Sequence, residues 1–281
     1  HTGLVGLKPS LSAVPREHVL PSLLLDFEVI GPLARTVADA RLLFEVVRGP
    51  HPVDRSSLSA GYPSAEAPRS GPLRVLYVER FGDAPLDPQI AASVGRAVSQ
   101  LEALGHRVER GALPLDLGFY AVAWPQIGQT GLARMFERHP EWEATASPRY
   151  REMAQAGRAL PAARLWDILE QVKQLRRDCV RLFERWDLIV LPSAAALPWT
   201  AEDAYPTRID GQEVGPRGHA VYTGWVNAAG LPALALPCAP SREGLPIGMQ
   251  VVGPYGSDNA LLAVGEAFER IAPWAERWPA L

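Results

Sequence analysis

Three residues of this sequence carry side chains that could do nucleophilic or base chemistry, and each stands in a different segment. Ser193 directly follows the apolar run "DLIVLP", Cys238 ends the run "LPALALP", and His219 lies in "RGHAVYTGWVN". A serine or cysteine nucleophile needs a base within hydrogen-bond reach, and a neutral histidine can act as that base. The sequence places no base next to either nucleophile. A loop-capping serine, a buried thiol and a structural histidine therefore remain alternative interpretations.

Other catalytic signatures are missing from the sequence. It contains no G-x-S-x-G elbow, no phosphate-binding Walker loop and no histidine pair with metal-ligand spacing. We therefore expect neither a metal nor a cofactor. The two cysteines, Cys179 and Cys238, are too few for a disulfide framework, which favours buried free thiols and a reducing, cytoplasmic compartment.

Composition excludes several classes of protein. The chain has 281 residues, 47% of them hydrophobic, and a formal net charge of −3. This charge gives no global attraction for nucleic acid, so we expect no nucleic-acid partner. No stretch reaches the about 18 apolar residues of a transmembrane helix, and no signal peptide is visible, so we expect no membrane partner.

Local patterns predict alternating helices and strands. A capping-box pair, Thr36 and Asp39, opens a helix that ends before Gly49. Residues 73–79 form a strand candidate, Asp87 and Pro88 begin the next helix, and residues 106–110 form a second strand. A strand, a helix and a strand in this order predict a βαβ unit with parallel strands.

The second half of the chain continues the pattern. Residues 118–160 are expected to be mostly helical, with interruptions at Pro125, Pro140 and Pro148, and residues 162–186 form one long helix. The runs "DLIVLP", "LPALALP" and "IGMQVVG" predict buried strands, and Asp258 is expected to cap a final helix. The fold class is therefore α/β, with a mixed central sheet flanked by helices. Basic residues on the long helix predict a solvated face rather than an anion-binding patch.

Three segments resemble the amidase signature family in the order in which that family carries them. They are "GLVGLKPS", "DFEVIGPLARTVADARLLFEVV" and "YTGWVNAAGLPALALPCAPSREGLPIGMQVVGPYGSDNALLAVGEAFE". The resemblance implies that residues 1–281 are the C-terminal portion of a single amidase domain. It is weak only over residues 118–186.

The resemblance also implies a chemistry. Such enzymes hydrolyse amides with a serine nucleophile, a second serine on a cis peptide and a lysine base. By the family pattern these groups precede His1, so no catalytic residue is assigned within the chain. Lys8 resembles a structural lysine of the family motif, and Lys173 lies on a polar helix face. Neither is expected to be buried and paired with a serine.

The parent protein is accordingly expected to hydrolyse a small linear amide without a cofactor, and this chain alone is expected to be inactive. The alternative functions are a non-catalytic pseudoenzyme or binding module, and a tRNA-amidotransferase-like subunit. Substrate-binding candidates are Thr223, Trp225 and Asn227, beside the run "LPALALP". Trp225 could form an apolar wall, while Asn227 can donate and accept hydrogen bonds or serve as a cap.

Two further expectations concern structure. Asp26 and Arg35 flank the "GPLAR" motif and are expected to form a structural ion pair or cap. The segment "TGLVGL" is expected to be an unpaired, apolar sheet edge, because the part of the family fold that would cover it is not in this sequence. Such an edge favours self-association, for which a homodimer is the simplest form.

Overall fold

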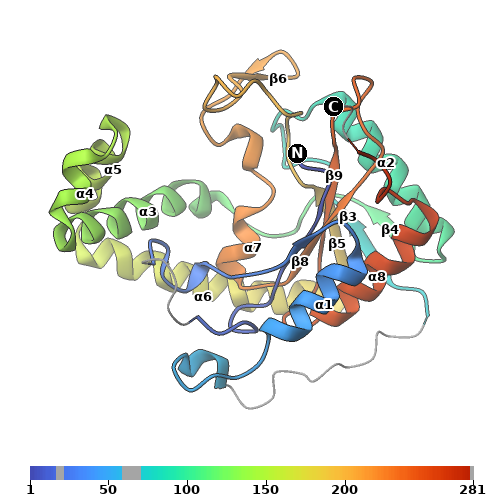
Figure 1. The fold of residues 1–281 in the computed structure, drawn as a ribbon, viewed down its shortest axis with the longest axis horizontal. Coiled ribbons are helices and arrows are strands. Elements are labelled where there is room, and N and C mark those ends of the chain that lie inside the picture. The colour runs from blue at the N-terminus through green and yellow to red at the C-terminus, as the bar shows by residue number, and fades with distance from the viewer. Residues whose placement is uncertain (17–21, 59–70, 279–281) are drawn as a thin grey trace.

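A seven-stranded mixed sheet forms the centre of the protein (Figure 1). The computed structural model describes residues 1–16, 22–58 and 71–278. The strands lie in the order β2-β1-β8-β9-β5-β3-β4. Their bounds are β1 Val5–Lys8, β2 Leu33–Ala34, β3 Arg74–Tyr77, β4 Arg107–Arg110, β5 Leu188–Pro192, β8 Ala233–Pro237 and β9 Gly248–Val252.

The sheet is parallel on one side and antiparallel on the other. Strands β5, β3 and β4 are parallel neighbours, which confirms the expected βαβ unit. The remaining neighbours pair antiparallel. The three runs predicted to be buried strands form β5, β8 and β9, and this confirms the mixed α/β fold.

The expected open edge at "TGLVGL" is wrong. Strand β1 pairs with β8 on one side and with β2 on the other, so it lies inside the sheet. Strand β2 comes from residues 33 and 34, close to β1 in sequence, and it covers the edge locally. The described structure therefore gives no support to self-association through β1.

Helices cover the sheet on both sides. They are α1 Val37–Val47, α2 Pro88–Ala103, α6 Ala162–Arg185, α7 Gly224–Ala229 and α8 Asp258–Ile271. The predicted start signals are confirmed: Thr36 accepts a hydrogen bond from the N–H of Asp39, and Asp87 accepts one from the N–H of Gln89. Each satisfies a backbone donor that the first helical turn leaves without a partner.

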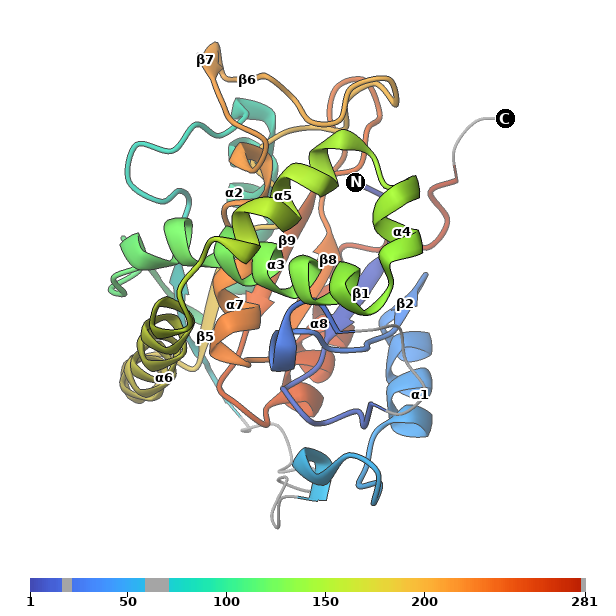
Figure 2. The ribbon, with the colours of Figure 1, turned by 90° about the vertical axis from the view of Figure 1, so that its left-hand side faces the viewer.

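Helices α3 Gly118–Arg138, α4 Pro140–Thr145 and α5 Pro148–Arg158 form an arm that projects beyond the sheet (Figures 1 and 2). The expected break at Pro125 is wrong, because α3 continues through it. Proline removes one helical hydrogen bond, to the carbonyl of Ala121, and Ala121 is exposed, so water can satisfy that carbonyl. Pro140 and Pro148 do begin new helices, as expected.

A short hairpin, β6 Arg208–Ile209 and β7 Gln212–Glu213, lies at the same end of the molecule as the first residue of the chain (Figures 1 and 2). Its turn uses Asp210 and Gly211, both with positive φ, as a two-residue hairpin loop requires. No helix in the described part of the chain is long and apolar enough to cross a membrane.

Candidate functional site

The first polar side chain beyond strand β5 belongs to Ser193. Its N–H donates to the carbonyl of Gly248 at 3.0 Å, which extends the β5–β9 pairing by one residue. Its hydroxyl is buried and has no hydrogen-bond partner among the described residues. A buried polar group without a partner costs about 1–3 kcal/mol, so Ser193 is a candidate for contact with a ligand or water.

Two histidine rings from other segments lie against Trp199, which is on the loop that follows Ser193. The Trp199 ring centroid lies 4.7 Å from that of His219 and 5.2 Å from that of His1. Backbone contacts hold the group, because the N–H of Ala195 donates to the carbonyl of His219 at 2.9 Å. The His1 ring contacts the carbonyl of Ala196 at 3.0 Å. The start of the chain therefore lies beside this loop.

The surroundings of His219 favour the neutral form of its imidazole. Its Nδ1 atom is buried and lacks a partner within the described ranges. Burial lowers the pKa of His219 below its ordinary value of 6.5, and the nearby charge of Arg217 lowers it further. A neutral imidazole offers one donor and one acceptor nitrogen, so His219 can bind an uncharged polar group at neutral pH.

The predicted binding residues Thr223, Trp225 and Asn227 lie in residues 217–227, which we term the site segment. Thr223 immediately precedes helix α7, and Asn227 uses its carbonyl to end that helix through Gly230, which has a positive φ of 72°. Trp225 is 0% exposed and packs in the core, but its Nε1 has no partner among the described residues. The structure thus brings these residues together on one short element.

Tyr120 of the projecting arm contacts the same segment. Its hydroxyl packs against Gly224 so closely that a Cβ atom there would lie 2.1 Å from the oxygen. The hydroxyl is buried, without a hydrogen-bond partner in the part of the chain that the structure describes. Burial raises the pKa of Tyr120, so the phenol stays neutral. Position 224 therefore needs glycine, and Tyr120 joins the arm to the candidate site.

The nucleophile candidates of the chain do not form a catalytic group. Ser193 has no hydrogen bond to His219. The thiol of Cys238 is buried and makes a long contact, 3.9 Å, with the carbonyl of Leu236. Burial raises the pKa of Cys238 to about 12, which keeps it a thiol at neutral pH. Cys179 is buried in the same way, as the sequence predicted.

Lys8 is half-buried beside a buried polar pair, Ser10 and Asp258, at the other end of strand β1. Ser10 donates its N–H and its hydroxyl to the two carboxylate oxygens of Asp258, at 2.8 and 2.6 Å. The ammonium of Lys8 donates to the carbonyl of Pro9 at 3.0 Å. Asp258 was expected to cap α8, but its carboxylate faces β1 instead, and this correction places a buried charge in the core.

Lys8 is half-buried and is not bonded to a serine, as expected. Desolvation lowers the pKa of Lys8 from 10.5 to about 8, although the charge of Asp258 opposes this shift. Ser10 is occupied by Asp258 and is not bonded to the amine. The cluster therefore links β1 to α8, which fits the structural role that the family motif implies for Lys8.

The lowered pKa predicts that the protein becomes more stable in alkali. Between pH 8 and 10 the unfolded chain holds a proton on Lys8 that the folded protein has lost, so the free energy of unfolding rises with pH. Urea denaturation at pH 8 and 9.5 measures this rise. The Lys8→Met variant should lack it, and an equal rise in both proteins would show that other groups cause it.

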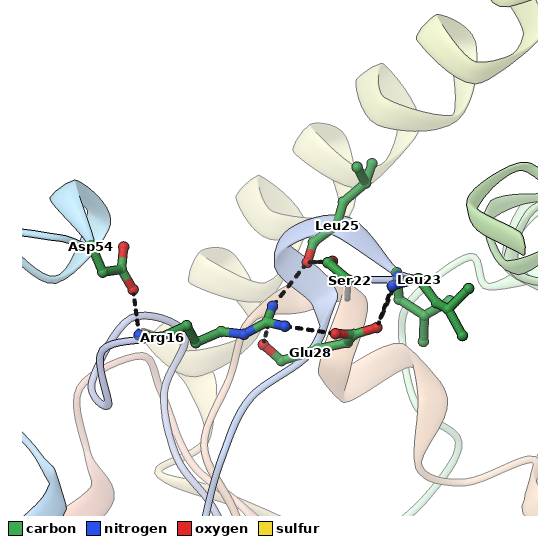
Figure 3. A network of polar contacts seen from close by, with 7 residues as sticks. Arg16, Ser22, Leu23, Leu25, Glu28 and Asp54 are labelled. Atoms are coloured by element: carbon green, nitrogen blue, oxygen red, sulfur yellow. Dashed lines mark hydrogen bonds and ion pairs between the residues drawn. The ribbon is translucent and has the colours of Figure 1, made fainter. Parts of the chain in front are cut away.

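The loop after β1 holds a second polar network, which Figure 3 shows from close by. Arg16 donates to a carboxylate oxygen of Glu28 at 2.7 Å, and the other oxygen accepts from the N–H groups of Leu23 and Leu24 at 3.0 and 2.9 Å. The network borders a cavity of about 370 Å³. Every charge drawn in it has a partner, so we assign it to the structure of the loop.

Asp26 and Arg35 do not pair with each other, contrary to one form of the expectation. Asp26 pairs with Arg176 of helix α6 at 3.1 Å. Arg35 donates to the carbonyl of Ala275 and lies over the ring of Trp278. Both residues join segments far apart in the sequence, which is a structural role with different partners from those expected.

Three groups of the site were not identified from the sequence: Tyr120, Trp199 and Arg217. They lie on the arm and on the loops before α7, where no periodic pattern marks a residue as part of a site. No group of three or more histidine, cysteine or acidic side chains is placed to hold a metal in the described ranges.

Known proteins match this chain in sequence and in fold. The family model "Amidase" matches residues 1–262. A glutamyl-tRNA(Gln) amidotransferase subunit from Synechococcus sp. (strain CC9605) is 32% identical over 96% of this chain and 60% of its own length. The same subunit from Roseiflexus sp. (strain RS-1) is 30% identical over 99% of this chain and 61% of its own.

The solved structure of 6-aminohexanoate cyclic dimer hydrolase matches 99% of this chain and 62% of its own, with a TM-score of 0.86 and 28% identity. The chain therefore spans about three fifths of the length of the relatives that it matches. The mixed sheet, the order of the motifs and the match over residues 1–262 agree. The chain belongs to the amidase signature family.

Proposed function

We propose that this chain is the C-terminal portion of a cytoplasmic amide hydrolase that acts on small linear amides without a cofactor. Family membership carries the proposal, together with the buried side-chain atoms of Ser193 and His219 that have no hydrogen-bond partner among the described residues. By the family pattern, the serine nucleophile, the second serine and the lysine base belong to chain outside residues 1–281. The described residues would then supply the wall that receives the substrate.

The proposed chemistry divides between the two parts of such a protein. Amide hydrolysis needs an activated nucleophile and an oxyanion site within hydrogen-bond reach of the same carbonyl. His1 lies against the loop of Ser193 and Trp199, so chain joined before His1 would reach the site directly. The hydroxyl of Ser193 and the imidazole of His219 would then face the substrate, as groups that bind rather than attack.

The test is an assay of the full-length protein on aryl and alkyl amides, with and without a chelator. We expect hydrolysis that the chelator does not change, because the proposed mechanism uses only side chains. Loss of activity with the chelator would contradict the cofactor-free mechanism. Absence of hydrolysis on the whole panel would favour a pseudoenzyme.

A second candidate function is that of an amidotransferase subunit, because several relatives carry that name. Most basic residues of α6 are already engaged with acidic neighbours. Lys173, Arg176, Arg181 and Arg185 each pair with an acidic side chain. An electrophoretic shift assay with tRNA separates the two functions, because tight binding at physiological salt would favour the amidotransferase.

A substitution that removes the indole N–H of Trp225 can separate an effect on substrate binding from an effect on stability. Replacement of Trp225 by Phe keeps most of the buried ring and removes a donor that has no partner among the described residues. We expect the thermal midpoint to fall by about 3–6 °C, because the smaller ring leaves a cavity that costs about 1–2 kcal/mol, whereas loss of the N–H itself costs little. A changed KM in the full-length enzyme would then show that this N–H contacts the substrate.

Asn227→Ala is the companion variant to Trp225→Phe. Its side chain is partly exposed, and its backbone carbonyl, which the substitution keeps, ends helix α7. A lower midpoint with unchanged kinetics in either variant would assign that residue to the structure alone.

A further inference from the structure

Arg217 stands out among the groups of the candidate site because it carries a charge without an acidic partner in the described structure. Its side chain is exposed, and no ion pair joins it to any residue within the described ranges. Other arginines of the same region differ, since Arg208 lies 3.7 Å from Glu213 on the neighbouring hairpin. The cation of Arg217 is therefore available for an external anion.

The backbone fixes where Arg217 lies. The N–H of Ala220 donates to its carbonyl at 3.0 Å, so Arg217 opens the short helical turn of residues 218–220. The turn is tight, because a Cβ atom on Gly218 would lie 2.5 Å from the Cβ of Val214. Two residues further on, His219 is tied to the Ser193 loop through Ala195. The guanidinium is thus carried by a constrained element.

The positive charge of Arg217 changes the pKa of two other groups. It lowers the pKa of His219, and it opposes the rise that burial causes in the pKa of Tyr120. Arg217 and His219 are on the site segment and Tyr120 is on α3, which meets the segment at Gly224. Both His219 and Tyr120 have buried polar atoms without partners in the described structure.

Aromatic side chains lie next to two groups close to Arg217, namely His219 and the contact of Tyr120 with Gly224. Trp199 uses its Nε1 to donate to the carbonyl of Asp203 at 2.9 Å, which fixes the orientation of a ring that is only partly buried. Its ring lies against His219, and Tyr120 lies 5.1 Å from Trp124 on the arm. Flat rings pack on such surfaces, and a guanidinium binds a carboxylate through two parallel hydrogen bonds.

We propose that Arg217 selects amide substrates that carry a carboxylate on a flat, aromatic part, with Trp199 and Tyr120 as the aromatic surface and His219 as a neutral hydrogen-bonding group. This inference rests on the proposed amide hydrolysis and names the substrate class for the same site. Arg217 touches the remote end of the substrate and takes no part in bond cleavage.

The matched probes are 4-acetamidobenzoate, which carries a carboxylate, and acetanilide, which does not. For the full-length wild type we expect a KM about tenfold lower for 4-acetamidobenzoate, equivalent to about 1.4 kcal/mol. The Arg217→Gln variant should bring the ratio of the two KM values close to one. The Arg107→Gln variant, changed at an exposed arginine on strand β4 at the sheet edge, should keep the wild-type ratio.

Calorimetric binding of both probes provides a readout that does not need turnover. If neither amide is hydrolysed but 4-acetamidobenzoate binds to the wild type and not to Arg217→Gln, the selection by Arg217 stands and the proposed hydrolysis fails. If both amides are hydrolysed with equal KM values, or if Arg217→Gln keeps the preference, the selection is wrong and the hydrolysis stands. Equal or absent binding of both probes, without turnover, overturns both.

Discussion

A preparation that contains only residues 1–281 should hydrolyse no amide. The described side chains that could attack a carbonyl lack what attack requires. Ser193 has no base bonded to its hydroxyl, and burial holds Cys238 as a thiol with a pKa of about 12. An unactivated alcohol or thiol reacts too slowly at neutral pH to give turnover above background.

The measurement combines intact mass spectrometry with an amidase assay. Mass spectrometry shows that no longer form of the protein is present, and the assay uses the same panel of amides as the full-length protein. Turnover by the pure fragment that the Ser193→Ala or His219→Gln variant abolishes would contradict the proposal. It would place the reaction on those residues instead of on chain outside the fragment.

Removal of the Asp258 carboxylate should produce a large loss in the free energy of unfolding. Asp258 is 1% exposed and accepts both hydrogen bonds from Ser10, while its charge also offsets that of Lys8. The Asp258→Ala variant leaves the Ser10 N–H without an acceptor and Lys8 without its opposite charge. Breaking a buried charged group of this kind costs about 3–5 kcal/mol.

Urea denaturation of wild type and variants measures the loss. Asp39→Ala is the matched control, because Asp39 is an exposed aspartate in the first turn of α1, and its removal should cost less than about 1 kcal/mol. Addition of Lys8→Met to Asp258→Ala should restore part of the stability, since it removes the uncompensated cation. Equal losses for Asp258→Ala and Asp39→Ala would show that the buried cluster contributes no more to the free energy of unfolding than an exposed aspartate does.

Most elements of the fold could be predicted because their signals are local. The capping pair Thr36 and Asp39, the Asp87–Pro88 start and the three apolar runs all depend on residues within a few positions of one another. Pro125 shows the limit of such reasoning. Whether a proline breaks a helix depends on what else satisfies the carbonyl it leaves free, and that depends on the exposure of the preceding turn.

The candidate site was less accessible to sequence reasoning. Thr223, Trp225 and Asn227 were predicted as binding residues because they lie in a family-like segment, and in the structure they lie on or beside one short helix. The burial of Trp225 was not foreseen, since a tryptophan before an apolar strand can face either side. Tyr120 reaches Gly224 because the start of α3 lies against helix α7, a contact between residues 104 positions apart.

The sequence by itself determined the family, the α/β class and the positions of most helices and strands, because these follow from motif order and from the period of apolar residues. Only the tertiary structure decided which polar groups are paired. Asp258 reads as a helix cap and is instead bound to Ser10, 248 positions away. Desolvation and pairing depend on neighbours in space. Only the folded chain therefore shows that Arg217 has no acidic partner, and Ser193 Oγ and His219 Nδ1 no hydrogen bond, among the described residues.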